Sequence, residues 1–167
     1  MLGHESIVRL LLSWPRDPPR ADEHNGRALI EAAWAGHKGI VRTLLEWPEH
    51  APSPDCQNGQ ALVWAAWQGH DEIVRMLLGW DGPGAAPRAD CQNGQAFVRA
   101  AANGHIDVMN VLLNWPVHAA RADSKNGQAL VEAASNGQVR GAKTLASRKC
   151  ILGWENKDPG LFLGMKP

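Results

Sequence analysis

The chain has 167 residues, of which 44% are hydrophobic and 20% are charged, and its formal net charge is zero. These values fit one soluble globular domain and exclude an intrinsically disordered tail. Seventeen basic residues balance seventeen acidic ones, so no charge excess favours nucleic acid or an anionic membrane as the partner. No apolar run reaches the roughly 18 residues of a transmembrane helix, and we expect no direct membrane insertion.

The N-terminal stretch and the cysteines indicate the compartment. The stretch MLGHESIVRLLLSWPR contains an acidic residue and an arginine within its apolar part, which is atypical of a secretory signal. Cys56, Cys91 and Cys150 are an odd number of cysteines in a chain that is long enough not to need disulfides. We therefore expect free thiols in a soluble, reducing compartment (cytoplasm, nucleus or organelle interior), and not secretion.

The first predicted element, a helix from Glu5 to Ser13, begins a pattern that recurs along the chain. The dipeptide Asn-Gly occurs at Asn25, Asn58, Asn93 and Asn126, with spacings of 33, 35 and 33 residues. Four tryptophans follow the same period, at Trp14, Trp47, Trp80 and Trp115. A period near 33 is typical of stacked units, none of which buries its apolar face without a neighbour.

The sequence pattern of each copy predicts two helices. The stretch A-L-[IV]-x-A-A indicates a short first helix that ends at a glycine, which suits a left-handed C-terminal position. These glycines are Gly36, Gly69, Gly104 and Gly137. The following H-x-x-[IV]-V-x-x-L-L places apolar residues on one face of a second helix. We expect its histidine or the residue before it to cap the helix start, and the Trp-Pro step to end it.

The connections between copies read as loops. In the second copy the loop runs from Pro48 to Asp55, and Cys56 to Gly59 form a tight turn. The segment Asp81 to Gly84 holds the two extra residues of the 35-residue spacing. We expect this insertion to lie on the solvent side.

Both ends of the repeat array are irregular. The helix from Glu5 to Ser13 has no first helix of its own, so either residues precede it or another chain covers it. Gly141 and Ala142 stand where the last copy needs Ile-Val, which is typical of a capping repeat. The sequence predicts a repeat domain over residues 1–147 and a non-repeat tail over residues 148–167.

The repeated residues resemble the ankyrin repeat. Its Asp, Ala-Ala, Gly-His, Ile-Val and Leu-Leu positions are occupied by Asp22, Ala32–Ala33, Gly36–His37, Ile40–Val41 and Leu44–Leu45. The resemblance implies an all-α, ankyrin-type helical solenoid of about four repeats, the first partial and the last degraded, with a non-repeat C-terminal tail. It also implies binding of a protein partner on the concave face.

The chain departs from the family pattern at the Thr-Pro-Leu-His corner, which is replaced by Arg27–Ile30 and by Gln60–Val63. The family's Thr-His hydrogen bonds between repeats cannot form without those residues. We expect the apolar residue at the His position to pack into the core instead. The sequence thus indicates a divergent, tryptophan-rich branch.

Trp34 and Trp67 follow the Ala-Ala pair, and Trp64 shares a helix side with Trp67. Exposed tryptophans dominate the binding energy of many protein interfaces. The third and fourth copies carry Ala102 and Ser135 at this position, so the feature belongs to the early copies. The predicted partner-binding residues are Trp34, Trp64, Trp67, Gln57, Gln68, Gln92 and Asn103.

Residues of the tight turns are expected beside these tryptophans, as a polar rim or simply as a solvated hairpin tip. They are Glu23, His24, Cys56, Gln57, Cys91, Gln92, Ser124 and Lys125. The four tryptophans that end the second helices are expected to pack on neighbouring loops, with a partly exposed apolar stripe as the alternative.

The recurring histidines and arginines indicate neither a metal site nor a nucleic-acid surface. His37, His70 and His105 would stand about 10 Å apart in stacked repeats, which is too far to share a zinc ion. Arg9, Arg42 and Arg75 have acidic neighbours in sequence, which favours a mixed, solvated face over a nucleic-acid surface. No nucleophile motif or phosphate loop is present. We expect no catalytic residue, metal or cofactor, and no enzyme activity.

The first functional hypothesis is a non-enzymatic protein–protein interaction module or scaffold that binds its partner through the concave face. The alternative is an accessory structural subunit built permanently into a large multiprotein complex. The incomplete first copy and an apolar tail favour the alternative. The apolar tail residues are Ile151, Leu152, Trp154, Leu161, Phe162 and Leu163.

Overall fold

The computed structural model describes residues 3–16, 18–116, 118–121 and 124–138. Over these residues the chain forms eight α-helices and no strand. The helices are α1 (Gly3–Leu12), α2 (Glu23–Trp34), α3 (Lys38–Leu45), α4 (Cys56–Gln68), α5 (Asp71–Leu78), α6 (Cys91–Asn103), α7 (Ile106–Leu113) and α8 (Ser124–Ser135). The predicted all-α fold is confirmed, whereas the predicted tail lies outside the described residues.

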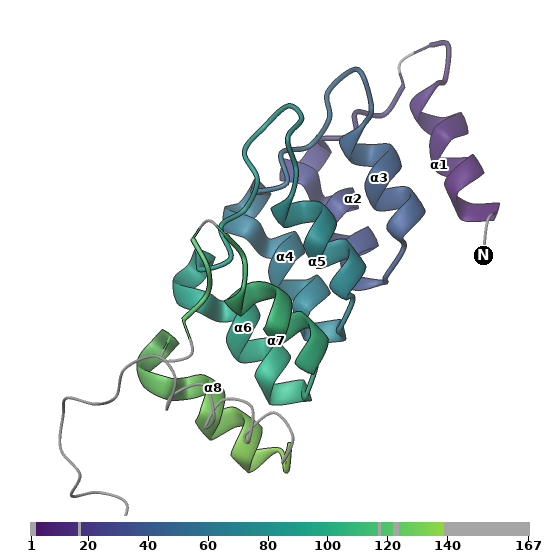
Figure 1. Cartoon of the computed structure of the whole chain (residues 1–167). Coiled ribbons are helices and arrows are strands. Elements are labelled where there is room, and N and C mark those ends of the chain that lie inside the picture. The colour runs from purple at the N-terminus through teal and green to yellow at the C-terminus, as the bar shows by residue number, and fades with distance from the viewer. Residues whose placement is uncertain (1–2, 17, 117, 122–123, 139–167) are drawn as a thin grey trace, which may run out of the picture.

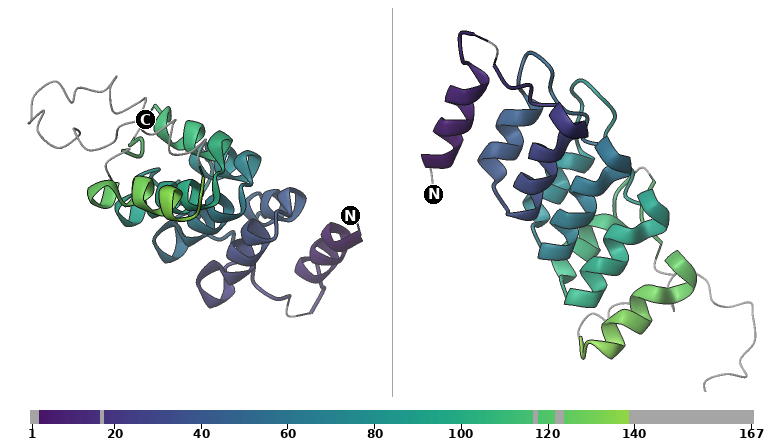
Figure 2. Two further views of the ribbon diagram at one scale, coloured as in Figure 1. Left: turned by 90° about the horizontal axis from the view of Figure 1, so that it is seen from below. Right: turned by 180° about the vertical axis from the view of Figure 1, so that it is seen from behind.

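The helices form two layers. The first helices of the copies, α2, α4, α6 and α8, pack on one another in order, and the second helices, α1, α3, α5 and α7, do the same. Within a copy, α2 packs on α3, α4 on α5, and α6 on α7. The result is an elongated stack with α1 at one end and α8 at the other (Figures 1 and 2). The predicted helical solenoid is therefore observed.

Each first helix begins with a left-handed turn. In α4 the backbone of Gln57, Asn58 and Gly59 has φ angles of 51°, 57° and 77°, and the regular helix follows. The turns of α2 and α6 have the same conformation. Glycine and asparagine adopt left-handed angles more readily than other residues, which explains the recurring Asn-Gly. The predicted tight turn over Cys56 to Gly59 is confirmed.

The glycine after each first helix has the predicted left-handed conformation. Gly69, which caps α4, has a φ of 82°, and Gly104, which caps α6, has a φ of 75°. Gly69 also lies against the His105 ring of the next copy, which an added Cβ would approach to 2.6 Å. Only glycine satisfies both the backbone angle and this contact.

The repeated histidines occupy the N-cap position of the second helices, as predicted, but they do not cap the helices through their side chains. His70 and His105 precede α5 and α7, but neither side chain makes a capping hydrogen bond. Their ring Nε2 atoms instead donate to the carbonyl oxygens of Trp34 and Trp67, at 3.2 and 2.9 Å. Each histidine thus links its copy to the preceding copy.

The core lies between the layers. The apolar residues at the family's His position, Ile30, Val63 and Val98, are all buried. This confirms the prediction that they pack into the core, and the hydrogen bonds of His70 and His105 take over the linking of copies. Phe97, Leu62 and other apolar residues of both layers are fully buried beside them.

The tryptophans that follow the second helices differ along the stack. Trp47, Trp80 and Trp115 are partly buried against the core, as predicted, whereas Trp14 is exposed. The second helix α5 ends at Leu78 although Asp81, not proline, follows its tryptophan. The Trp-Pro step is therefore not required to end a second helix.

The two-residue insertion lies on the solvent side, as predicted. Asp81, Pro83 and Gly84 are exposed, and the Trp80 indole donates a hydrogen bond of 2.9 Å to the Pro83 carbonyl oxygen. This bond holds the longer loop against the body of the stack.

Candidate functional site

Trp34, Trp64 and Trp67 line one hollow between two adjacent first helices. Ile30 and Glu31 of α2 complete its lining, and its volume is about 400 Å³. Trp34 is 46% exposed, which is a large fraction for an apolar side chain of this size. The hollow therefore offers aromatic surface, an apolar residue and one carboxylate to a bound molecule.

The two tryptophans of α4 form a stack. The ring centroids of Trp64 and Trp67 are 4.7 Å apart and their planes are inclined by 18°. Arg99 of α6 lies over the Trp67 ring, with its guanidinium carbon 5.3 Å from the ring centroid. This geometry is a cation–π contact. The stack and the arginine hold the α4 side of the hollow in a defined arrangement.

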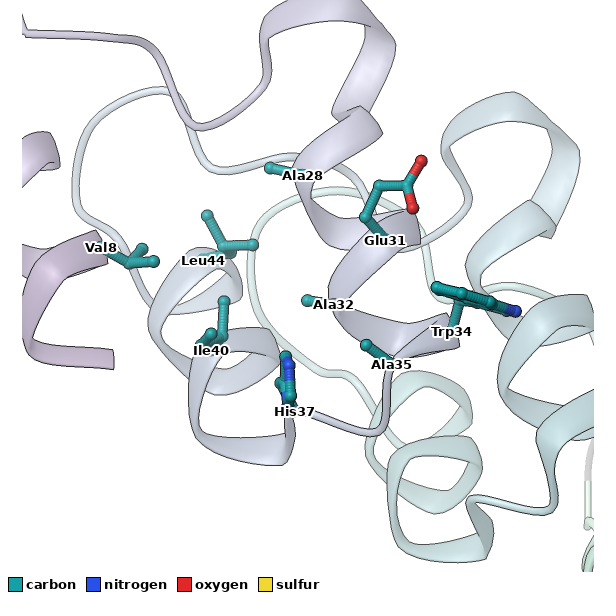
Figure 3. Close-up of a pocket in the computed structure, with 9 residues that line it drawn as sticks. All are labelled: Val8, Ala28, Glu31, Ala32, Trp34, Ala35, His37, Ile40 and Leu44. Carbon is teal, nitrogen blue, oxygen red and sulfur yellow. The ribbon is translucent and has the colours of Figure 1, made fainter. Parts of the chain in front are cut away.

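A second hollow lies on the other side of α2, toward α1. It measures about 310 Å³ and is lined mainly by apolar residues of α1, α2 and α3. Figure 3 shows Val8, Ala28, Ile40 and Leu44 around it, with Trp34 at its edge pointing toward the next copy. Trp34 and Glu31 thus line both hollows.

Two of the predicted polar residues lie near the end of a first helix, close to the tryptophans in sequence. Gln68 ends α4 and is exposed. Asn103 ends α6, and its amide nitrogen donates a hydrogen bond of 2.8 Å to the Trp67 carbonyl oxygen. Asn103 therefore links two copies, as His105 does. The sequence alone does not reveal this role.

The other two predicted polar residues lie elsewhere. Gln57 and Gln92 belong to the left-handed turns at the start of α4 and α6, whereas Trp67 lies at the far end of α4. Their side-chain amides donate to the carbonyl oxygens of Asn25 and Asn58, at 3.3 and 3.0 Å. Gln57 and Gln92 are thus not beside Trp67, and none of the residues that line the tryptophan hollow comes from the turns.

Cys56 and Cys91 are free thiols, as predicted, but they are buried and not part of a rim. Each packs under the left-handed turn of the preceding copy, where an added Cβ on Gly26 or Gly59 would approach the sulfur to 2.6 or 2.7 Å. Burial raises the pKa of both thiols to about 11. A thiol of that pKa is protonated at neutral pH and is a poor nucleophile.

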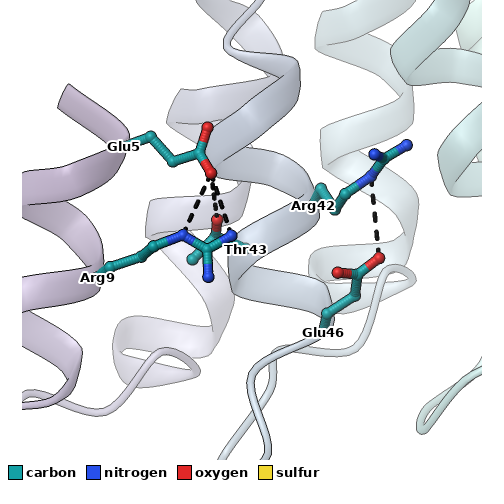
Figure 4. A network of polar contacts seen from close by, with 5 residues as sticks. All are labelled: Glu5, Arg9, Arg42, Thr43 and Glu46. Carbon is teal, nitrogen blue, oxygen red and sulfur yellow. Dashed lines mark hydrogen bonds and ion pairs between the residues drawn. The ribbon is translucent and has the colours of Figure 1, made fainter. Parts of the chain in front are cut away.

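The arginines of the second helices pair with acidic residues, so this face is mixed in charge. Arg9 pairs with Glu5 at 3.1 Å and Arg75 with Asp71 at 3.7 Å. Glu5 also accepts a hydrogen bond of 3.3 Å from the Thr43 hydroxyl, which joins α1 to α3 (Figure 4). The predicted solvated face of both charges is observed for these pairs.

The part of the chain that the structure describes contains no cluster of three His, Cys, Asp or Glu residues able to hold a metal ion. Within the same residues, no helix is both long enough and apolar enough to cross a bilayer.

Sequence reasoning missed three residues of the site. Ile30 and Glu31 line the tryptophan hollow, and Arg99 covers Trp67. The alignment of copies contained the signal, because Glu31, Trp64 and Arg99 occupy the same position in successive first helices. Stacking brings equivalent positions of neighbouring copies together, so each residue at this position faces the hollow or the tryptophan of the copy before it.

Comparison with known proteins identifies the repeats. A family model described as ankyrin repeats (3 copies) matches residues 1–87. A search of curated proteins found no significant match. The helix pairs continue beyond the matched region through α6, α7 and α8 with the same packing.

Proposed function

Because the chain belongs to the ankyrin repeat family, whose repeats are in general protein–protein interaction modules, we propose that it binds a protein partner through its first-helix layer. The contact centres on Trp34, Trp64 and Trp67. The partner's side chains enter the hollow between α2 and α4, and Gln68, which follows Trp67 at the end of α4, adds a polar contact. The chain acts as an interaction module or scaffold.

The observation that carries this proposal is the exposure of Trp34 beside a hollow lined by two further tryptophans. Indole rings bury large apolar areas at low entropic cost and are enriched among the residues that dominate interface energies. A volume of about 400 Å³ accommodates one or two side chains of a partner, which suits a protein contact with a central anchor.

The family is typically non-enzymatic, and we propose the same for this chain. The buried thiols of Cys56 and Cys91 have raised pKa values, and the Nε2 atoms of His70 and His105 are engaged with backbone carbonyls. These residues serve the packing of neighbouring copies. The proposed activity, binding of a protein partner, needs no cofactor.

An affinity experiment tests the proposal. The full chain is immobilised, and proteins captured from a cell extract are identified by mass spectrometry and then purified for direct titration. We expect Trp34→Ala to weaken binding of a true partner by about 30-fold, since truncation of a central anchor typically costs about 2 kcal/mol. Trp14→Ala removes a tryptophan of similar exposure, 53%, and is the matched control.

Circular dichroism on both variants accompanies the titration. Unchanged helicity with selective loss of binding in Trp34→Ala supports the proposal. Equal binding by wild type and Trp34→Ala contradicts it, and loss of helicity would show that Trp34 supports the fold.

A second function is favoured by a different observation, the exposed apolar face of α1. Ile7, Leu10 and Leu11 of this helix are exposed. In an accessory structural subunit this face is covered permanently by another component of the assembly. Contiguous exposed apolar surface is typical of such contacts.

Solution behaviour separates the two functions. A monodisperse monomer that unfolds cooperatively supports the interaction module. A chain that stays soluble only with co-purified proteins, and whose capture of them is lost in Leu10→Glu but kept in Trp34→Ala, supports the structural subunit.

A further inference from the structure

We propose that the hollow between α2 and α4 is an arginine-binding site, which takes the guanidinium of an exposed, positively charged segment of the protein partner. The inference rests on the proposed function and names the chemistry that this surface recognises. The bound guanidinium lies against the indole rings and is neutralised by Glu31.

The lining of the hollow matches a cation better than an apolar side chain. Trp34, Trp64 and Trp67 supply three indole rings, and Glu31 supplies the carboxylate. The face of an indole ring carries negative potential and attracts cations, with tryptophan the strongest of the aromatic residues. An apolar side chain would use the rings but would further desolvate the Glu31 carboxylate without supplying it a hydrogen bond, which is unfavourable.

The chain itself contains a model of the proposed contact one copy further along. Arg99 of α6 lies 5.3 Å from the centroid of the Trp67 ring of α4. Trp64 occupies in α4 the position that Arg99 occupies in α6. The early junction therefore presents a tryptophan where the later junction presents an arginine, and among the described residues no arginine lines the hollow beside Trp34.

The guanidinium is favoured over an ammonium by its shape. It is planar and weakly hydrated, so it stacks on a ring while its edge donates hydrogen bonds to a carboxylate. The ammonium of lysine is compact and strongly hydrated, and it gains less from a ring that is half exposed. The hollow of about 400 Å³ is wide enough for the planar group and the methylene stem beside Ile30.

Two charged neighbours bear on the affinity. Arg27 pairs with Glu31 at 3.5 Å, but both side chains are more than half exposed, and such pairs contribute little and exchange readily. Arg99 adds positive charge on the Trp67 side. We therefore place the partner's guanidinium against Trp34 and Trp64, on the Glu31 side of the hollow.

Nuclear magnetic resonance of the full chain tests the inference with defined probes. The indole N–H signals of the tryptophans are followed while N-acetyl-arginine amide is added, and N-acetyl-citrulline amide, its neutral isostere, is added in a parallel titration. We expect the Trp34 and Trp64 signals to shift in a saturable way. Arginine should bind about 2- to 30-fold more tightly than citrulline, the range expected for a cation–π contact.

Variants assign the effect. Glu31→Gln should weaken arginine binding and leave citrulline binding unchanged, and Trp34→Ala should abolish the preference for arginine while Trp34→Phe retains part of it. Trp14→Ala is the control and should bind as the wild type does. Lysine amide in place of arginine should bind more weakly.

Three results would overturn the inference: equal shifts with arginine and citrulline, shifts of similar size at Trp14, or an arginine preference that survives Trp34→Ala. Failure of the proposed function is distinguishable from failure of this inference. A partner whose capture depends on Trp34, combined with no discrimination between arginine and citrulline, would retain the protein-binding function and reject the arginine site.

Discussion

The helices α1 and α5 carry nearly the same apolar pattern but lie in different surroundings. Ile7 and Leu11 of α1 are 53% and 49% exposed, whereas the equivalent Ile73 and Leu77 of α5 are 2% and 0% exposed. The helix α5 lies between α3 and α7 and packs on α4, whereas α1 packs on α3. Burial in this fold is thus set by the neighbouring copies and not by the pattern of the helix itself.

The same contrast holds between the interior junctions and the other end of the stack. Gly69 lies against the His105 ring, while an added Cβ on Gly137, which follows α8, has no atom of the described residues within 4 Å. We therefore expect equivalent residues to contribute more to stability where a copy packs on both sides of them than at an end of the stack. This is the behaviour of a quasi-one-dimensional repeat array. Matched substitutions at interior and terminal copies test this rule.

The largest difference is expected for the leucines of the second helices. Leu77→Ala should lower the free energy of unfolding by about 2–5 kcal/mol, since it leaves a cavity in a fully buried site. Leu11→Ala should cost under about 1 kcal/mol because the side chain is half exposed. Urea denaturation followed by circular dichroism measures both. Equal losses would mean that α1 is covered in solution.

The glycines after the first helices should show a smaller difference. Gly69→Ala and Gly137→Ala both place alanine at a positive φ, which costs about 1–2 kcal/mol. Gly69→Ala should cost about 1 kcal/mol more, since the His105 ring must move and lose its hydrogen bond to the Trp67 carbonyl. This excess should vanish in a His105→Ala background, as thermal unfolding of the four proteins would reveal. An excess that persists there would contradict the contact.

The buried thiols test how tightly the interior junctions are closed. Burial raises the pKa of Cys56 from 9.0 to about 11, so the folded state holds the thiol proton more tightly than the unfolded state. The stability from this thiol is complete below pH 9 and is lost as the pH rises toward 11. At pH 10 the loss should be about 1 kcal/mol relative to pH 8. A Cys56→Ala variant, compared by urea denaturation at both pH values, should lack this component.

Thiol reactivity provides an independent check of the same junctions. In a Cys150→Ser chain, Cys56 and Cys91 should react with a disulfide reagent at pH 8 only after unfolding. Rapid reaction of either thiol in the folded chain would show that the junction opens.

The smallest effect is expected for the exposed ion pairs. Arg9→Gln at the end of the stack and Arg75→Gln in its interior should each change stability by less than about 0.5 kcal/mol. Their exposure is similar, at 53% and 58% of the arginine side chain. Position in the stack should therefore not matter here, unlike for the leucines. A loss above 1 kcal/mol for either variant would contradict this expectation.

Much of the candidate site was predictable because it is repeated. The alignment of copies placed Trp34 and Trp67 at one position and Trp64 on the same helix side, and the structure brings all three around one hollow. The roles of Gln57, Gln92 and Asn103 were not predictable. Their amides bond to carbonyls of the preceding copy, and such contacts depend on how far one copy is rotated and shifted against the next.

The sequence by itself determined the helix pairs, the tight turns, the left-handed glycines after the first helices, and the apolar faces, because these follow from local backbone preferences and from a period of about 3.6 residues. Only the tertiary structure decided which of the equivalent residues are covered. It buried Leu77 and left Leu11 exposed, directed the side chains of His70 and His105 to the preceding copy, and set Arg99 over Trp67. The physical reason is that burial and pairing in a stack are properties of two adjacent copies, which no single copy encodes.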